Sequence, residues 1–494
     1  MKKNSIIFIL TAISPFLHAA DNDTRLRLDQ ELLQQKIEQQ QPFIQQQQAD
    51  QLPAMVIDGE TIKVEKNLND VGRALYIAVM QKQWQAASIY LDSYLKLEGY
   101  DPSLAHFAQG ALARMQGQPQ QAEQHFQQAL ALQPQNSMIK LELARLLTER
   151  QKNKEAKQLF QQVKDQLAQS ADPSVQNIGK TVDLYLNGLK QRDAWQGSVS
   201  AGTRYAANIN SSSEQTATWT IYAEDGNGNK VPVQQVTRGT PAQINAAALD
   251  YEAALSKRWS MQSNHGIALK AFGYGRAYDS RKDYNETTLN FNAGYSYQDQ
   301  RNQLLIVPVY EHRRVQNESL SNAWGARAEW MRFIGQDKAF KLEAEIKDID
   351  NVKYSTQSGM ENSVFSTFWK VLPQQWTLFG GLDYVDHNSE EQYFTAYEQQ
   401  GVRLGLSKQF KEAGFNAALF SSYRWRQYDK YNSVLEEKRQ DFEQNYTLVF
   451  SAPKWELYGL TPNLTYQYNK NRSNVDWLYS YDKHNVSLKL ERRF

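Results

Sequence analysis

Four carboxylates are the first candidates for chemistry in this sequence of 494 residues. Glu343 and Glu345 lie two positions apart, and Asp383 and Asp386 lie three positions apart. Such pairs can act as general acid and base when a fold places them beside a substrate. Both pairs, however, stand in segments where charged and apolar residues alternate, which favours hydrated charges along one face of a β-strand. We therefore expect no catalytic residues here.

The other reactive side chains form no recognisable site in the sequence. The seven histidines do not have the spacing of metal ligands, and there is no cysteine for thiolate or disulfide chemistry. Gly273 and Gly275 make a GxG pattern inside an expected strand, with no following helix to bind a phosphate. We expect no metal and no cofactor. An enzyme assembled from residues on separate strands stays open as an alternative.

Alternating segments fill the chain from residue 194 to residue 494. Between Thr288 and Gln298, and again between Asp441 and Ser451, apolar residues alternate with small or polar ones. A period of two places the two sets on opposite faces of a strand. Segments of about ten residues with aromatic ends are typical of transmembrane β-barrels. We predict an antiparallel outer-membrane barrel of about fourteen strands over residues 194–494.

The connections between these segments predict the orientation of the barrel. After the first strand, 195–205, a long polar loop leads to a return strand that ends near Trp259. Short turns are expected at 260–264, 299–303, 335–338, 373–375 and 411–414, and longer connections at the other end, such as 355–362 and 427–438. Short turns are typical of the periplasmic end. An even strand count then places both ends of the barrel in the periplasm. The remaining strands are expected at 265–279, 284–299, 302–317, 321–335, 338–354, 363–373, 376–390, 393–410, 414–431, 438–455, 459–474 and 479–494.

Charges of both signs are expected on the inward face of the barrel. A pore selective for ions of one sign would carry an excess of the other sign. A mixed, hydrated wall suits a conduit for a polypeptide, although a generic lumen looks the same. The candidate lumen residues are Lys341, Glu343, Glu345, Lys347, Asp383, Arg424 and Arg426.

A helical repeat precedes the barrel, over residues 66–190. Small residues recur at Ala87, Ala122 and Ala156, at intervals close to 34 residues. This period resembles tetratricopeptide repeats, in which small residues let paired helices approach and stacked repeats form a solenoid. Such an array binds a partner on its concave side or acts as a spacer. Candidate partner-facing residues, which packing would explain equally well, are Leu104, Phe107, Met138 and Leu141.

The N-terminal residues predict export. A positive start, an apolar run over 6–17 and a small-residue end at Ala19 and Ala20 are typical of a secretory signal peptide over residues 1–20. Residues 21–65 are Gln-rich, and we interpret them as a helical or flexible segment. Their thin apolar stripe favours a solvated or frayed helix, with a docking or plug segment as the alternative. The stripe consists of Leu26, Leu28, Leu32 and Leu33.

The last strand contains a candidate signal for assembly of the barrel. Val486, Leu488 and Leu490 share one face, and the strand ends at Phe494. A final strand of this kind resembles the signal read by the barrel assembly machinery. Arg492 departs from the apolar pattern. We therefore regard Arg492 and Phe494 as the candidate assembly signal and seam of the barrel.

Together, the signal peptide, the short repeat array and the barrel resemble the Slam family of surface lipoprotein assembly modulators. The barrel opening carries the most specific likeness, Trp195-Gln196-Gly197 followed by Gly202 and 208–211, Asn-Ile-Asn-Ser. The resemblance implies an outer-membrane translocator with its repeats in the periplasm. Its clients would be surface lipoproteins, or secreted hemophilin-like proteins, that serve nutrient acquisition.

The resemblance also bears on partners. It implies contact with outer-membrane lipid, the barrel assembly machinery and periplasmic chaperones, in a monomer that needs no cofactor. The formal net charge of +1 gives no indication of nucleic acid binding. An exopolysaccharide export porin with periplasmic repeats, or a passive pore, is the alternative.

Overall fold

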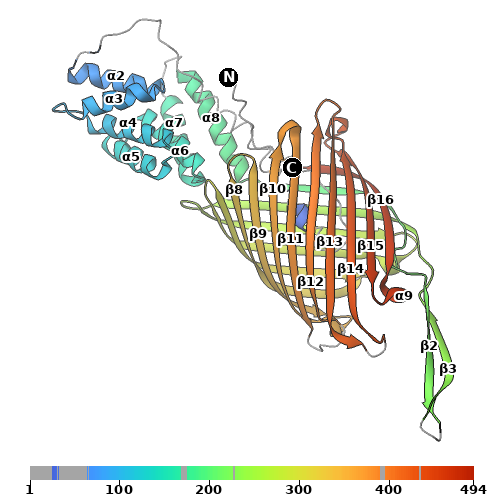
Figure 1. The fold of residues 1–494 in the computed structure, drawn as a ribbon. Coiled ribbons are helices and arrows are strands. Elements are labelled where there is room, and N and C mark those ends of the chain that lie inside the picture. The colour runs from blue at the N-terminus through green and yellow to red at the C-terminus, as the bar shows by residue number, and fades with distance from the viewer. Residues whose placement is uncertain are drawn as a thin grey trace.

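The computed structural model describes residues 25–29, 32, 64, 66–168, 175–225, 229–389, 395–432 and 435–494. A curved stack of helices leads into a closed antiparallel barrel, and a thin hairpin extends from the far end of the barrel (Figure 1). Within the described residues, no helix is long and apolar enough to cross a membrane.

In the part of the chain that the structure describes, seven helices form the stack ahead of the barrel. Consecutive helices pair in antiparallel fashion, and the pairs lie side by side (Figure 1). The helices are α2 (Leu68–Met80), α3 (Trp84–Tyr94), α4 (Pro102–Met115), α5 (Pro119–Leu132), α6 (Ser137–Glu149), α7 (Asn153–Ala168) and α8 (Val175–Arg192).

Capping residues start several of these helices. The side chains of Asn67, Asp101 and Asn136 accept hydrogen bonds from backbone N–H groups of the first turns of α2, α4 and α6. These bonds satisfy donors that have no partner within the helix. Pro102 and Pro119 lie in the first turns of α4 and α5, where the missing N–H costs nothing.

Small residues bring the paired helices together, as the repeat pattern predicts. Ala87, Ala122 and Ala156 are fully buried at the helix crossings. Gly110 of α4 faces the ring of Phe126 on α5 so closely that a Cβ at this position would lie 2.8 Å from ring atom Cδ1. The tetratricopeptide-like architecture is therefore confirmed.

Fourteen strands close the barrel, which confirms the predicted fold class. Each strand pairs with its neighbours in antiparallel fashion, and β1 closes the ring between β4 and β16. The strands are β1 (Gln196–Ala206), β4 (Ala246–Ser260), β5 (His265–Tyr278), β6 (Glu286–Gln298), β7 (Asn302–Val315), β8 (Glu318–Ile334), β9 (Lys338–Asn351), β10 (Gly359–Leu372), β11 (Trp376–Ser389), β12 (Tyr397–Phe410), β13 (Phe415–Asn432), β14 (Glu437–Ser451), β15 (Thr461–Ser473) and β16 (Tyr481–Arg493).

The two faces of the barrel differ as the alternation predicts. On β6, Asn290 and Asn292 are buried inside, whereas Phe291 between them is 47% exposed on the outer face. Stacked aromatic pairs lie toward both ends of the barrel; one is Phe410 with Phe415, whose ring centroids are 4.6 Å apart. An apolar outer band with aromatic ends fits a lipid bilayer.

The long polar loop predicted after the first strand is wrong in part. Residues Thr216–Glu224 and Lys230–Gly239 form strands β2 and β3, a hairpin that extends away from the barrel (Figure 1). Pro232 lies where the pairing register shifts. A two-stranded ribbon tolerates Pro at such an irregularity because the ladder is already interrupted there.

Two predicted outer connections are too long. Strands β13 and β14 continue their pairing out to Asn432 and Glu437, so the strands occupy most of the predicted 427–438 connection. Strand β10 begins at Gly359, inside the predicted 355–362 loop. Between β7 and β8 only Gln316 and Asn317 form the turn, both with positive φ, as two-residue hairpins require. The extended parts of these strands carry polar residues on both faces, so no alternation marked them as strand.

The helical stack contacts the short-turn end of the barrel. The Asn264 side-chain amide donates to the backbone oxygen of Arg150 at 2.5 Å. Asn153 donates to the Ser260 hydroxyl at 3.2 Å, and that hydroxyl donates to Asp193 at 2.7 Å. The end of α6 and the start of α7 therefore rest against the turn between β4 and β5.

Candidate functional site

The predicted lumen residues face the inside of the barrel, where opposite charges lie in contact. Six of them are buried, and Arg426 is partly exposed. They belong to two clusters, one on β8 to β10 and one on β11 to β14. The seven residues are Lys341, Glu343, Glu345, Lys347, Asp383, Arg424 and Arg426.

The first cluster follows β9. The Lys341 ammonium lies 3.3 Å from Glu329 and 3.2 Å from Glu343. The Lys347 ammonium lies 3.3 Å from both Glu345 and Glu361. Each of these lysines therefore sits between carboxylates. Two further cations of the wall, Lys270 and Arg327, pair with Glu329 and Glu345, so charges of both signs are paired at this level.

The second cluster lies on β11 to β14. Arg403 donates to Asp383 at 2.7 Å, and the Arg424 guanidinium lies 3.8 Å from the same carboxylate. Arg426 reaches Glu443 at 3.8 Å. Arg403 and Glu443 were not predicted, although both stand on the polar face of an alternating strand, which is the signal that could have indicated them.

A third group, not predicted from the sequence, joins the first and last strands of the barrel. Lys489 of β16 is fully buried and reaches across β1 to two acids of β4, Asp250 at 3.2 Å and Glu252 at 2.8 Å. Arg204 of β1 lies 3.5 Å from Asp250. We call Arg204, Asp250, Glu252 and Lys489 the closing-strand cluster.

Gly202 of β1 makes room for this crossing. A Cβ at Gly202 would lie 2.5 Å from the Cα of Lys489 and 2.0 Å from the backbone oxygen of Leu488. Strands β1 and β16 therefore approach closely at this point, and the Lys489 side chain passes over the glycine. Side-chain ion pairs therefore join the closing strands in addition to the backbone pairing.

The candidate seam residues lie at the short-turn end of the same strand pair. The backbone N–H and C=O of Phe494 both bond to Gly197 at 3.0 Å, which extends the β1–β16 pairing to the last residue. Arg492 is exposed and lies opposite Val199 in the register. Their role as an assembly signal stays a prediction.

A short helical segment from the N-terminal region lies inside the barrel. Residues 25–29 are helical, and with Leu32 they form what we call the lumenal segment. Leu26, Leu28 and Leu32 are between 1% and 4% exposed. Their interpretation as the stripe of a solvated helix is therefore wrong, because the lumen covers them; Leu33 lies outside the described residues.

Charged side chains tie the lumenal segment to the wall. The Arg25 guanidinium lies 3.1 Å from Glu343, and the Arg27 guanidinium lies 2.6 Å from Glu252. These pairs could not be predicted, because the partners in the first of them are 318 positions apart.

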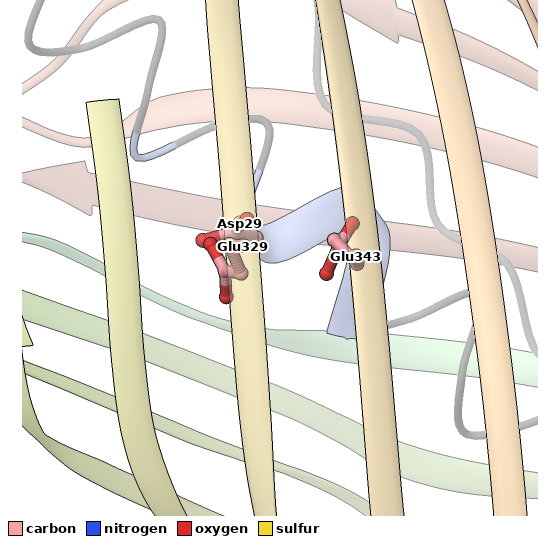
Figure 2. Close-up of side chains that lie close together, drawn as sticks. All are labelled: Asp29, Glu329 and Glu343. Atoms are coloured by element: carbon pink, nitrogen blue, oxygen red, sulfur yellow. The ribbon is translucent and has the colours of Figure 1, made fainter. Parts of the chain in front are cut away.

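Asp29 lies in a group of three acids. Figure 2 shows Asp29 on the lumenal segment beside Glu329 and Glu343, which come from two adjacent strands. One oxygen of each lies within 4.8 Å of the others, a spacing that could hold a cation. Three cations already neutralise the three acids, since Lys270 and Lys341 pair with Asp29 and Glu329, and Arg25 pairs with Glu343. The group is therefore better described as an ion-pair network than as a metal site.

The repeats carry a separate groove of about 350 Å³. Leu104 and Met138, both partly exposed, line it together with Phe107, whose side chain is mostly buried in the helical core. Leu141 is buried in that core and does not line the groove. Tyr76 adds a ring beside Phe107, with centroids 6.3 Å apart. Two charged residues, Arg73 and Asp101, complete a mainly apolar groove that an extended peptide could enter.

Two histidines face each other across α4 and α5. The Nδ1 atoms of His106 and His125 are 3.3 Å apart, and the rings stack. Burial, followed by the charge of His106, lowers the pKa of His125. The pair therefore favours a state in which at least one ring is neutral.

Comparisons with known proteins cover nearly all of the chain. A family model described as "Surface lipoprotein assembly modifier" matches residues 195–494, and one described as "Surface lipoprotein assembly modifier, N-terminal TPR repeats" matches residues 57–160. A protein of Acinetobacter baumannii named Hemophilin secretion modulator is 55% identical over 498 residues, which cover 100% of both chains.

More distant relatives carry the family name itself. A Surface lipoprotein assembly modifier 1 of Neisseria meningitidis serogroup B is 26% identical and aligns with 89% of this chain and 85% of its own length. The protein of the same name from Haemophilus influenzae is 25% identical, with 85% and 84% covered.

Proposed function

Because this chain belongs to the surface lipoprotein assembly modifier family, we propose that it is an outer-membrane translocator that carries client proteins to the cell surface or beyond. One observation carries the proposal: the 55% identity, over the full length, to a protein named for hemophilin secretion. Relatives named for lipoproteins are only 21–26% identical. The favoured client is therefore a secreted, hemophilin-like protein, with a surface lipoprotein as the second candidate.

The division of the chain supports this function. The repeats rest on the short-turn end of the barrel, which is the periplasmic end of such barrels. A client would meet the repeat groove first and the lumen second. The apolar residues of the groove suit an unfolded or extended client segment, whereas the paired charges of the lumen give a wall without a strong preference for either sign.

Other partners follow from the same function. The barrel assembly machinery would read the last strand, which ends at Phe494, and periplasmic chaperones would deliver the client. The translocator itself acts as a monomer that needs no cofactor. The free energy for transport would come from folding of the client outside the cell, from hand-off by a chaperone or from the barrel assembly machinery. We propose no catalytic role for the residues of this chain.

Co-expression tests the proposal in a host that lacks both proteins. A hemophilin-like protein and a surface lipoprotein are each expressed with and without the translocator. We expect the hemophilin-like client in the medium only when the translocator is present. A periplasmic marker enzyme, measured in the same medium, controls for lysis.

The outcome also separates the two clients. Protease treatment of intact cells removes a displayed lipoprotein and leaves a periplasmic one intact. If only the lipoprotein is displayed, the surface lipoprotein becomes the favoured client and the hemophilin-like protein the second candidate. Retention of both clients inside the cell, with the barrel inserted, would contradict the proposed function.

A further inference from the structure

The lumenal segment reaches from one wall of the barrel to the opposite one. Leu28 and Leu32 share a buried cluster with Ala254 of β4 and two aromatic residues of β5. Leu26 shares another with Phe365 of β10 and Val385 of β11. In the ring of fourteen strands, β11 lies seven strands away from β4 and is therefore opposite it. The segment therefore crosses the full width of the lumen.

Ion pairs fix the segment on both sides of this crossing. Arg27 binds Glu252 of β4 at 2.6 Å, and Arg25 binds Glu343 of β9 at 3.1 Å. The Arg25 guanidinium also lies 5.7 Å from the ring centroid of Phe365, within the range of a cation–π contact. A charged segment of this length could not order itself alone, so these wall contacts hold it in place.

The wall keeps its own partners for the charges that the segment binds. Lys270 also contacts Glu329 at 2.8 Å, and Lys341 also contacts Glu343 at 3.2 Å. Glu252 likewise contacts Lys489 at 2.8 Å. A buried charge that loses its sole partner is strongly destabilising. Because each wall charge has a second partner, departure of the segment leaves none of them isolated.

From this arrangement we propose that the lumenal segment is an internal plug. It closes the lumen in the resting protein and leaves it when a client occupies the same space. This role deepens the proposed function, on which the step of displacement by a client rests. Closure of the lumen does not depend on that function. A wide barrel with a charged lumen would otherwise leak small ions across the membrane.

Conductance in planar bilayers tests closure without any client. In the release variant, Arg27→Glu and Leu28→Asp place acids against Glu252 and in the apolar cluster of Leu28. The control, Arg27→Lys with Leu28→Met, keeps the charge and the apolar side chain. We expect conductance to rise about tenfold in the release variant because an open, hydrated lumen replaces a filled one. Equal conductance in the release variant and the parent would overturn the proposal.

A disulfide tests whether the segment must move. The chain has no cysteine, so Leu28→Cys with Ala254→Cys introduces a single pair within one buried cluster. The control pair, Ser422→Cys with Asn445→Cys, joins register partners within the wall of β13 and β14. Oxidation should stop client export only in the first pair, and reduction should restore it. Export that continues with the first pair fully oxidised would overturn the proposal.

The two measurements separate this proposal from the proposed function. If the release variant conducts and the parent exports neither client, the plug stands and the function fails. If the parent exports its client while the release variant stays closed, the function stands and the plug fails. Heat-dependent mobility on gels verifies that each variant has folded as a barrel, and the disulfide pair tests the plug even if the release variant does not fold.

Discussion

Replacing Lys489 by Met tests whether the closing-strand cluster holds the barrel together. The Lys489 side chain is fully buried and contacts Asp250 at 3.2 Å and Glu252 at 2.8 Å. Breaking a buried ion pair by removing one partner costs about 3–5 kcal/mol. Both acids keep another cation, since Arg204 lies 3.5 Å from Asp250 and Arg27 lies 2.6 Å from Glu252. We therefore expect a loss at the low end of that range, about 3 kcal/mol.

Urea unfolding of the barrel in lipid vesicles measures this loss through tryptophan fluorescence. Lys470→Met is the matched control, because it makes the same change at a partly exposed position of the neighbouring strand β15. A double-mutant cycle with Glu252→Gln isolates the contact itself. Groups in one ion-pair network couple by about 0.5–3 kcal/mol, so the double variant should lose less than the sum of the single losses.

Two results would refute this account of the closing-strand cluster. One is a Lys489→Met barrel as stable as the Lys470→Met control. The other is strict additivity in the cycle. Either would mean that backbone pairing of β1 with β4 and β16 supplies the whole stability of the closure.

Three further predictions concern the repeats. Phe126→Ala removes a fully buried ring and should lower the stability of the helical stack by about 3–5 kcal/mol, measured by helical circular dichroism of the full chain, whereas the exposed Gln128→Ala should change it little. Leu104→Asp should reduce client export because it places a charge in the apolar repeat groove, while the same change at Leu132, which is 53% exposed, should leave the amount of exported client unchanged. Because the pKa of His125 is lowered in the folded state, the unfolded chain binds the proton more readily. The stack should therefore lose stability as the pH falls below about 7, through the ordinary value near 6.5, and His125→Gln should reduce this loss in thermal unfolding measured as a function of pH.

The architecture could be predicted because its signals are local. Alternation along one strand, as around Phe291, places side chains on two faces without knowledge of any neighbour. The spacing of Ala87, Ala122 and Ala156 likewise marks helix crossings within each repeat. The fourteen strands and the tetratricopeptide-like repeats follow from such patterns.

The ion pairs between the lumenal segment and the barrel wall could not be predicted, because they join residues that are far apart in the sequence. Arg25, Arg27 and Asp29 look like the charges of a solvated helix until the wall supplies Glu343, Glu252 and the lysines. The ion pairs of Lys489 could not be predicted for the same reason. The sequence places it on the polar face of the last strand, but its partners lie two strands away, beyond a glycine.

Among the predicted site residues, the structure separates neighbours in the sequence pattern. Met138 lines the repeat groove and is partly exposed, while Leu141, about one turn later on the same helix, is buried in the core. The period identifies the apolar face of a helix but does not show whether a neighbouring helix covers it.

The β2–β3 hairpin gives the outer end of the barrel freedom to diversify. It belongs to the connection between Ala206 and Ala246, which are paired in the barrel wall, so its length can change without shifting the register of any barrel strand. Val231 and Val233 are exposed on it. Among the described residues, strands β2 and β3 pair only with each other and not with the barrel, so substitutions on this ribbon leave the pairing of the wall unchanged. The same property makes it a natural position for an inserted epitope.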